Sequence, residues 1–275
     1  MKIRYLGTAA AEGFPALFCN CSVCARARKL GGKNLRSRSQ AVIDDSLLID
    51  FPPDTYYHTI SGNLSLPKIK NLIITHSHSD HCYMLDVMQR DEPFAHGIPA
   101  EKLHIFGNQE VRRVYYNARA EFSHIDSEDT AEFTFVKPFV SFQAGEYSVT
   151  PLKATHDKRE DCYIYIIQKD EKRILYANDT GFFPEETWEY IKPLRFDLVS
   201  LDCTMGLVRD GKNHMGLEDD LELRSRLLKM KCADEDTKLI VTHFSHNGGL
   251  LQDEIQEKIK DYGMTAAYDG MEISI

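Results

Sequence analysis

The chain has 275 residues, enough for one large or two small domains and for a sizeable hydrophobic core. Hydrophobic residues make up 43% and charged residues 27%, as in ordinary globular proteins, and no window approaches the roughly 18 apolar residues of a membrane span. The net charge of −9 repels phosphate backbones and so disfavours long nucleic acid as a partner, although the basic stretch 24–38 keeps that alternative open.

Strands dominate the predicted elements of the first two thirds of the chain. Runs rich in Val, Ile, Tyr and Phe and bounded by Gly, Asp, Asn or Pro are typical of strands. These runs are residues 2–6, 40–51, 69–75 and 102–107, a pair within 131–155 and a pair within 162–179. Helical periodicity interrupts them at 80–91 and 108–122. The acidic stretch 120–133 is predicted as a solvated loop, with a lid as the alternative.

Helices and strands alternate in the last third of the chain. Helical periodicity marks residues 184–194, 216–231 and 250–263, and strand-like runs mark residues 196–202, 237–244 and 265–275. Strands in runs, followed by strands alternating with amphipathic helices, predict two sheets faced by helices. We therefore expect one α/β domain that spans residues 1–275.

Seven cysteines are distributed unevenly along the chain. Three of them crowd into CNCSVC (19–24), a spacing too tight for pairwise disulfides, and the other four lie apart. This distribution suits a reducing compartment and a metal-binding knot better than a disulfide framework. The cysteine pattern therefore predicts a cytoplasmic protein.

The stretch NLIITHSHSDHCYML (71–85) packs His76, His78, Asp80 and His81 into six positions after a hydrophobic run. We expect a buried strand before these residues and a helix beginning at Asp80, so that they lie in the turn where α/β proteins place chemistry. Such a turn can direct His76 and His78 to one side and Asp80 and His81 to the other, as two adjacent cations would need.

Three later hydrophobic strands also end in a potential ligand, namely His156, Asp179 and His243. Neutral imidazole and carboxylate are the usual ligands of zinc, manganese and iron in proteins. A single His or Asp at the end of a strand is commonly a capping group, or a polar residue at the point where the chain leaves the core. Four such positions in one chain, one of them a quadruple cluster, predict a metal centre instead.

THSHSDH (75–81) resembles the H-x-H-x-D-H motif of the metallo-β-lactamase fold superfamily. The three later strand-end ligands stand in the chain order of that superfamily's remaining metal positions. LGTAAAEGFP near the N-terminus is similar to its glycine-bearing first loop, and LLIDFPPD is similar to its strand ending in a supporting aspartate, here Asp50. The resemblance covers residues 3–275 and implies a four-layer αββα sandwich with two metals at one edge.

The resemblance also implies how the ligands divide between two divalent cations, which could be zinc, manganese or iron. The expected ligands are His76, His78 and His156 for one metal, Asp80, His81 and His243 for the other, and Asp179 as the bridge between them. True β-lactamases have a cysteine in place of Asp179, which argues against antibiotic hydrolysis. The oxygen-reducing diiron branch has a glutamate in place of His78, which argues against that chemistry.

A second metal site is expected around Cys19, Cys21 and Cys24. A closed structural zinc site needs four ligands, and His246 is the attractive fourth because it follows His243 by three residues in THFSHN. Such a site would pin the N-terminal loop against the strand end that carries His243. A loop of free thiols is the alternative.

The cysteine cluster and THFSH together resemble the PhnP-like phosphodiesterases of the bacterial carbon–phosphorus lyase pathway. DGKNHMG (210–216) is similar to a loop of that branch in which a histidine works on the substrate, here His214. The resemblance implies hydrolysis of a small phosphate diester, cyclic ones included, by a hydroxide shared between two metals. Asp80, His214 and Asp50 are the residues expected to serve this catalysis, and a homodimer is implied.

Three other functions share parts of these motifs. A transfer-RNA 3′-end nuclease shares the fold and the catalytic motif, but that class usually has a long basic, glycine-rich arm that this chain lacks. A glyoxalase II-like esterase or thioesterase has a compatible ligand set without the cysteine cluster. A biosynthetic protein of the pyrroloquinoline quinone type has a similar cluster, but a scaffold of that kind needs no open dinuclear centre.

Overall fold

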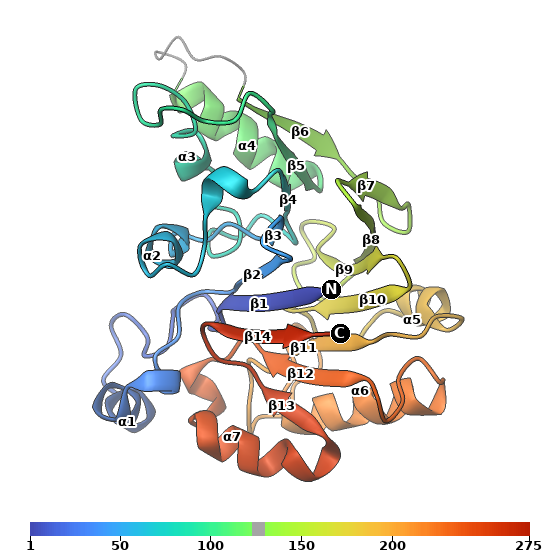
Figure 1. Ribbon diagram of the computed structural model, residues 1–275. Coiled ribbons are helices and arrows are strands. Elements are labelled where there is room, and N and C mark those ends of the chain that lie inside the picture. The colour runs from blue at the N-terminus through green and yellow to red at the C-terminus, as the bar shows by residue number, and fades with distance from the viewer. Residues whose placement is uncertain (123–129) are drawn as a thin grey trace.

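The computed structural model describes residues 1–122 and 130–275, and in this part of the chain two seven-stranded sheets pack face to face (Figure 1). The first sheet has the order β14-β1-β2-β3-β4-β5-β6, with β1 (Lys2–Gly7), β2 (Gln40–Ile43), β3 (Leu47–Ile49), β4 (Asn71–Ile73), β5 (Leu103–Gly107), β6 (Ala131–Phe135) and β14 (Met271–Ser274). The second has the order β13-β12-β11-β10-β9-β8-β7, with β7 (Phe142–Ala144), β8 (Tyr147–Lys153), β9 (Tyr163–Lys169), β10 (Lys172–Ala177), β11 (Leu198–Asp202), β12 (Lys238–Thr242) and β13 (Met264–Ala266).

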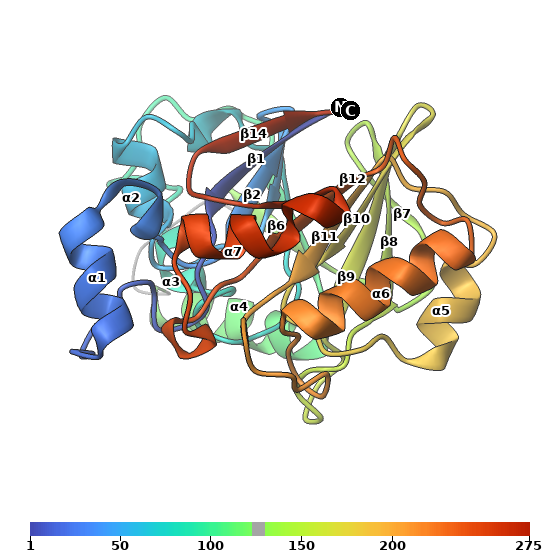
Figure 2. The same cartoon turned by 90° about the horizontal axis from the view of Figure 1, so that it is seen from below.

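Helices cover the outer faces of the two sheets, as the view from below shows (Figure 2). They are α1 (Ser22–Leu30), α2 (Thr55–Ile60), α3 (Met84–Val87), α4 (Gln109–Glu121), α5 (Glu185–Ile191), α6 (Leu217–Lys229) and α7 (Gln252–Ile259). The layers therefore run helix, sheet, sheet, helix, which confirms the αββα sandwich that the sequence predicts. No helix in the described ranges has the length and apolar character needed to cross a bilayer.

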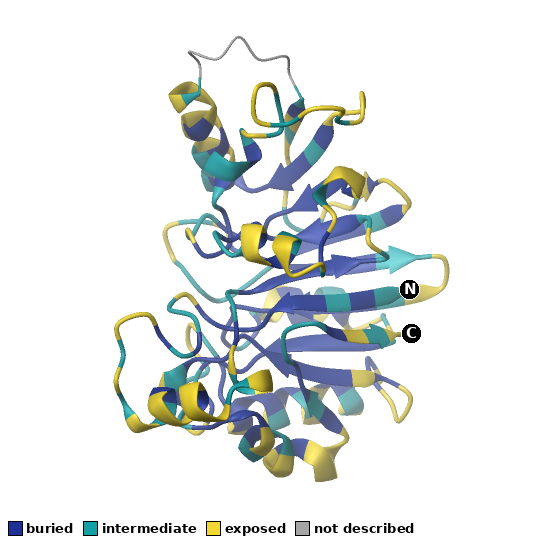
Figure 3. Ribbon diagram, turned by 60° about the vertical axis from the view of Figure 1, so that its left-hand side comes forward, coloured by how far each residue is buried: buried dark blue, intermediate teal, exposed yellow. Residues whose placement is uncertain are grey.

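Three apolar layers hold the sandwich together. Residues such as Tyr5, Ile43 and Tyr165 fill the space between the two sheets and are almost completely buried. The second layer lies under α3 and α4, and the third lies under α5, α6 and α7. Most strands are accordingly buried along most of their length, whereas most helices expose their outer side (Figure 3).

Parallel pairing brings the strand ends of interest to one edge. In the first sheet β3, β4, β5 and β6 run parallel, and in the second sheet β10, β11, β12 and β13 run parallel. The carboxyl ends of parallel strands meet at the same edge of a sheet, where α/β proteins place their sites. The loops that follow β3, β4, β10, β11 and β12 therefore lie next to one another.

Most predicted elements are present, with several differences. The pair of strands expected within 131–155 is three strands, β6, β7 and β8, and the single strand expected at 265–275 is two, β13 and β14, which lie in different sheets. Residues 40–51 form two strands joined by a turn at 44–46, and the short helix α2 and the cysteine-containing helix α1 were not expected. The prediction that a helix begins at Asp80 is wrong, because α3 begins at Met84. The backbone N–H groups of His81 and Cys82 both donate to the His78 carbonyl, so the ligand-rich segment is a tight turn. The acidic stretch falls largely on residues 123–129, which lie outside the described ranges, and its last residues belong to β6.

Candidate metal centre

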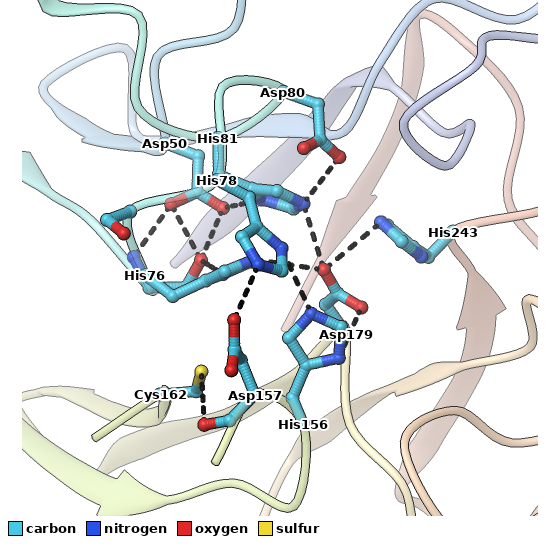
Figure 4. A network of polar contacts seen from close by, with 12 residues as sticks. Asp50, His76, His78, Asp80, His81, His156, Asp157, Cys162, Asp179 and His243 are labelled. Carbon is cyan, nitrogen blue, oxygen red and sulfur yellow. Dashed lines mark hydrogen bonds and ion pairs between the residues drawn. The ribbon is translucent and has the colours of Figure 1, made fainter. Parts of the chain in front are cut away.

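The seven expected ligands of the dinuclear site come together at the shared strand edge (Figure 4). The donor atoms form two groups of four, and within each group all four atoms lie within 4.8 Å of one another. One group is formed by His76, His78, His156 and Asp179, and the other by Asp80, His81, His243 and Asp179. The turn after β4 supplies His76, His78, Asp80 and His81. The loops after β8, β10 and β12 supply the other three. The division of the turn into two sides is the one that the sequence predicts.

Asp179 belongs to both groups, and one of its oxygens lies between them. Asp179 Oδ2 is 3.3 Å from His76 Nε2, on one side, and 3.2 Å from His81 Nε2, on the other. The same oxygen is 3.8 Å from His243 Nε2. Asp179 is thus placed where a carboxylate could be shared by two neighbouring cations.

The donor atoms fit divalent cations in chemistry and in spacing. The Nε2 atoms of His76, His81 and His243 and Asp179 Oδ1 are buried and have no hydrogen-bond partner in the described part of the chain. Buried polar atoms normally have a partner, so this convergence of partnerless atoms indicates a ligand. Adjacent donors of a metal bound at about 2.1 Å lie about 3.0–3.4 Å apart. The 3.2 Å between His78 Nδ1 and His156 Nε2 has that spacing.

Unusual backbone conformations fix three of the strand ends. Asp50, Asp179 and His243 have φ angles of 65°, 57° and 63°, in the left-handed region that residues other than glycine rarely adopt. Each follows the end of a strand, and each such conformation costs on the order of 1–3 kcal/mol unless the surroundings hold it. The chain therefore turns sharply at these residues and directs their side chains into the edge of the sandwich.

Asp50 supports the turn that carries the metal ligands. Its fully buried carboxylate accepts hydrogen bonds from Thr75 N at 2.8 Å, from Thr75 Oγ1 at 3.0 Å and from His81 Nδ1 at 2.8 Å. A ligating histidine usually donates its other ring N–H to such a group, which fixes the tautomer and the ring orientation. Asp50 thus leaves His81 Nε2 free to face the metal site.

His214 lies beside the bridging aspartate, together with a residue that the motifs did not reveal. Its Nδ1 is 3.0 Å from Asp179 Oδ1 and 3.2 Å from Oδ2 of Asp202, a fully buried residue at the end of β11. Asp202 also accepts hydrogen bonds from Thr204 N and Met215 N. The same strand-end pattern that marks the other ligands is present in FDLVSLD and could have identified Asp202.

Asp157 is a second supporting residue that sequence reasoning missed. It follows His156 directly and lies 3.0 Å from His78 Nε2, the ring nitrogen that points away from His156. Next to it, Glu160 accepts hydrogen bonds from Ser77 N and Asn108 Nδ2 and so ties the ligand turn to the start of α4. Both acidic residues are only partly buried, at the rim of the site.

The electrostatics of the site follow from burial and from its carboxylates. Burial and the neighbouring imidazoles lower the pKa of His76 well below its ordinary value. Burial also opposes the charged form of His81, but the carboxylates of Asp80 and Asp50 outweigh it and raise the pKa of His81. In the same way, Asp179 and Asp202 outweigh the burial of His214 and raise its pKa to about 11. The edge is therefore rich in negative charge and attracts cations.

The donors of the expected structural zinc site also come together. Cys19, Cys21, Cys24 and His246 form one cluster in which His246 Nδ1 is 3.6 Å from Cys19 Sγ and 3.5 Å from Cys21 Sγ. A tetrahedral zinc with bonds of about 2.3 Å to sulfur and about 2.05 Å to nitrogen separates those atoms by about 3.6 Å. The spacing therefore fits a closed tetrahedral site. A backbone hydrogen bond from Cys24 lowers the pKa of the Cys21 thiol to about 6, which favours the thiolate.

The basic stretch 24–38 is largely engaged within the chain. Arg26 pairs with Glu254, and Arg38 pairs with Asp54. Arg36 is buried and donates to Gln252 and to Thr8 Oγ1. Arg36 and Arg38 are therefore engaged in internal contacts, whereas Arg26 is paired but remains about half exposed.

A family model described as a beta-lactamase superfamily domain matches residues 47–244, which include the whole dinuclear ligand set. The chain belongs to the beta-lactamase superfamily. It is a hydrolase of the metallo-β-lactamase type, with clusters of potential metal ligands, as its H-x-H-x-D-H motif predicts.

Solved structures with the same fold cover the whole chain. A diphosphatase of the PhnP family is 22% identical with a TM-score of 0.76, over 100% of this chain and 97% of its own. Zn²⁺-bound PqqB from Methylobacterium extorquens is 16% identical with a TM-score of 0.73, over 100% of both chains. The short form of human tRNase Z is 18% identical with a TM-score of 0.68, over 100% of this chain and 99% of its own. At these identities the likeness is one of fold.

The curated relatives are longer proteins, and this chain covers only part of each. An octanoyltransferase from Porphyromonas gingivalis is 22% identical over 100% of this chain and 52% of its own length. A ribonuclease Z from Listeria innocua is 25% identical over 67% of this chain and 60% of its own length. The chain thus spans only about half to three fifths of these relatives.

Proposed function

We propose that this hydrolase is a dinuclear metal-dependent phosphodiesterase acting on small phosphate diesters, cyclic ones included, with a separate structural zinc and one domain over residues 1–275. The observation that carries the proposal is the position of Asp179 Oδ2 between two complete ligand groups, with His214 beside it. Such a centre suits a substrate that bears negative charge and a leaving oxygen.

Two divalent cations in this centre would lower the pKa of a water molecule and neutralise charge that grows on a phosphoryl group. The two ligand groups would hold those cations, and Asp179, which belongs to both groups, would serve both. Asp50 keeps the His81 proton on Nδ1, and Asp157 keeps the His78 proton on Nε2. The opposite nitrogen of each ring therefore faces the centre. Asp80 completes the second ligand group.

His214 is the candidate proton donor. Its Nδ1 forms a hydrogen bond with Asp202 Oδ2 and lies beside Asp179, so Nε2 is the atom that remains for the substrate. About a quarter of the side chain is exposed, so Nε2 could release its proton to a departing alkoxide, a step worth on the order of 10²–10⁴ in rate. Asp202 would hold the ring in position during this transfer.

The structural zinc would be held by the three thiolates and His246. His246 begins a short 3₁₀ turn, His246–Gly248, three residues after the metal ligand His243. Zinc at this point would fasten helix α1, which begins at Ser22, to the end of β12 and so shape one side of the centre. Thiolates in this role require a reducing compartment, and we place the protein in the cytoplasm.

A transfer-RNA 3′-end nuclease is the second candidate. The matches to ribonuclease Z and to the fold of human tRNase Z support it. The net charge of −9 and the engagement of Arg26, Arg36 and Arg38 within the chain argue against a long RNA substrate. A small diester therefore remains the preferred substrate class.

Turnover assays separate these functions. The protein, loaded with zinc, manganese or iron, should hydrolyse bis(p-nitrophenyl) phosphate faster than a thioester or a transfer-RNA precursor. His214→Ala should reduce turnover by on the order of 10²–10⁴ and leave the metal content unchanged. The matched control is His104→Ala, because His104 is half-exposed and pairs with Glu132.

The outcomes assign the function. Loss of metal in His214→Ala in step with activity would contradict its role as proton donor. Cleavage of the precursor with little diester turnover would favour the nuclease, and thioester cleavage alone would favour the glyoxalase II type. Size-exclusion chromatography tests the homodimer that the family resemblance implies.

A further inference from the structure

An apolar cavity lies outside the metal centre, on the outer face of the first sheet. It has a volume of about 260 Å³, is partly open to solvent, and is bordered by β3, β4, α2, α3 and the loop around residues 95–99. Leu48 and Leu72 form its floor from the two strands, Val87 lines it from α3, and Ile98 lines it from the loop. Figure 1 shows α2 and α3 on the same side of these strands.

The size of the cavity sets the size of its ligand. An engineered protein cavity of about 150 Å³ lined by leucine, isoleucine and phenylalanine binds benzene, which has six carbon atoms. In proportion, 260 Å³ accommodates about ten non-hydrogen atoms. Most of the lining side chains are apolar, so most of those atoms should be carbon.

The positive charge of Arg90, at one side of the cavity, determines which polar group the ligand should carry. Arg90 lines the cavity, and its guanidinium donates to the backbone carbonyls of Thr130 and Glu101. It pairs with no carboxylate in the described part of the chain, and burial lowers its pKa. The nearby Asp91 carboxylate favours the charged form of Arg90 but makes no ion pair with it, and a half-buried guanidinium of this kind is suited to an anionic ligand. Asp86, the carboxyl group in the lining, has a pKa raised by burial.

We propose that this cavity binds a straight-chain carboxylate of about eight carbon atoms, with its alkyl chain against Leu48, Leu72 and Val87 and its carboxylate on Arg90. Eight carbons and two oxygens supply the ten atoms that the volume allows. The site is separate from the centre that would hydrolyse phosphate diesters.

An occupant of this cavity would contact residues that pack against the C-terminal end of the metal-ligand turn. Phe51 lines the cavity; its N–H donates to the His81 carbonyl, and its carbonyl accepts from Tyr83 N, both at 2.7 Å. Helix α3, which carries Val87, begins at Met84 directly after the turn. Binding should therefore change the opening of this turn as well as the stability of the helix.

Calorimetric titration of the metal-loaded protein with sodium octanoate tests the proposal. Octanoate should bind with one site per chain and raise the melting temperature. Each methylene that enters the cavity should tighten binding about fourfold, so butyrate should bind on the order of 10²-fold more weakly. Octylamine, which has the same chain and the opposite charge, should not bind measurably.

Two variants with matched controls locate the ligand. Arg90→Gln should weaken octanoate binding about 10-fold to 100-fold, whereas Arg113→Gln on the exposed side of α4 should not. Ile98→Trp should fill the cavity and abolish binding, whereas Val140→Trp, at an exposed position in another loop, should leave it intact. Melting temperatures verify that all four variants fold.

The proposal is overturned if octanoate fails to bind wild-type protein at millimolar concentration, or if octylamine binds as well as octanoate. It is also overturned if Ile98→Trp folds and binds octanoate as the wild type does. None of these readouts depends on turnover, so their failure would leave the phosphodiesterase assignment untouched, and loss of that assignment would leave the cavity ligand untouched.

Discussion

Replacement of Asp50 by asparagine should weaken one of the two catalytic metal positions more than the other. The two oxygens of Asp50 divide their work: Oδ1 accepts from Thr75 N, and Oδ2 accepts from His81 Nδ1 at 2.8 Å. Asparagine keeps the shape but has one acceptor, so its amide group would face the His81 N–H donor to donor. The ring would then favour the tautomer with the proton on Nε2, the atom that faces the metal.

The size of the effect follows from this loss. Removal of a supporting partner of a metal-bound histidine costs about 10-fold to 100-fold in metal affinity, or about 1.4–2.8 kcal/mol. Competition titration with a chromophoric chelator should show this loss for the metal held by Asp80, His81 and His243. Affinity at the other position should change less, since Asp50 contacts neither His78 nor His156 and reaches His76 only through Thr75 Oγ1.

Asp54→Asn is the matched control. Asp54 accepts from Arg38 and contacts none of the seven ligands, so both metals should bind as in the wild type. If Asp50→Asn binds two metals with unchanged affinity, the support of His81 by Asp50 does not matter for the metal, and the reasoning fails.

Two further predictions concern the cysteine cluster and a buried histidine. Cys21→Ser should lose one zinc per chain and lower the melting temperature, whereas Cys232→Ser should keep its zinc; normal zinc content in Cys21→Ser would end the structural-site proposal. Burial lowers the pKa of His58 to about 4, below its unfolded value of about 6.5, so the unfolded chain binds the extra proton between those values. The free energy of unfolding should therefore fall by about 3 kcal/mol from pH 6.5 to 4, and His58→Gln, measured by urea unfolding, should reduce this slope; an unchanged slope would contradict it.

The clustering of the seven candidate ligands could be predicted because its signal is local. Each follows a hydrophobic strand, and parallel strands end at one edge, so residues far apart in sequence are bound to meet. Asp202 ends the strand FDLVSLD with the same local signal and could have been identified in the same way. Asp157 was missed because its role depends on a contact with His78, 79 positions away.

Other features depend on packing that no local pattern records. Helix α2 has six residues, too few for helical periodicity to be recognised, and α3 starts late because the turn before it is held by the His78 carbonyl. The cavity beside α2 and α3 is formed by segments that extend from Leu48 to Leu103. Its existence depends on how those segments pack together, and not on the residue types at any one place.

The most direct test of the dinuclear centre is an anomalous-scattering difference map from crystals of the purified chain, recorded at the absorption edges of zinc, iron and manganese. The account predicts two adjacent peaks on either side of Asp179, one beside His76, His78 and His156 and the other beside Asp80, His81 and His243. A map in which these seven side chains surround only solvent, in crystals grown with the metal present, would contradict it.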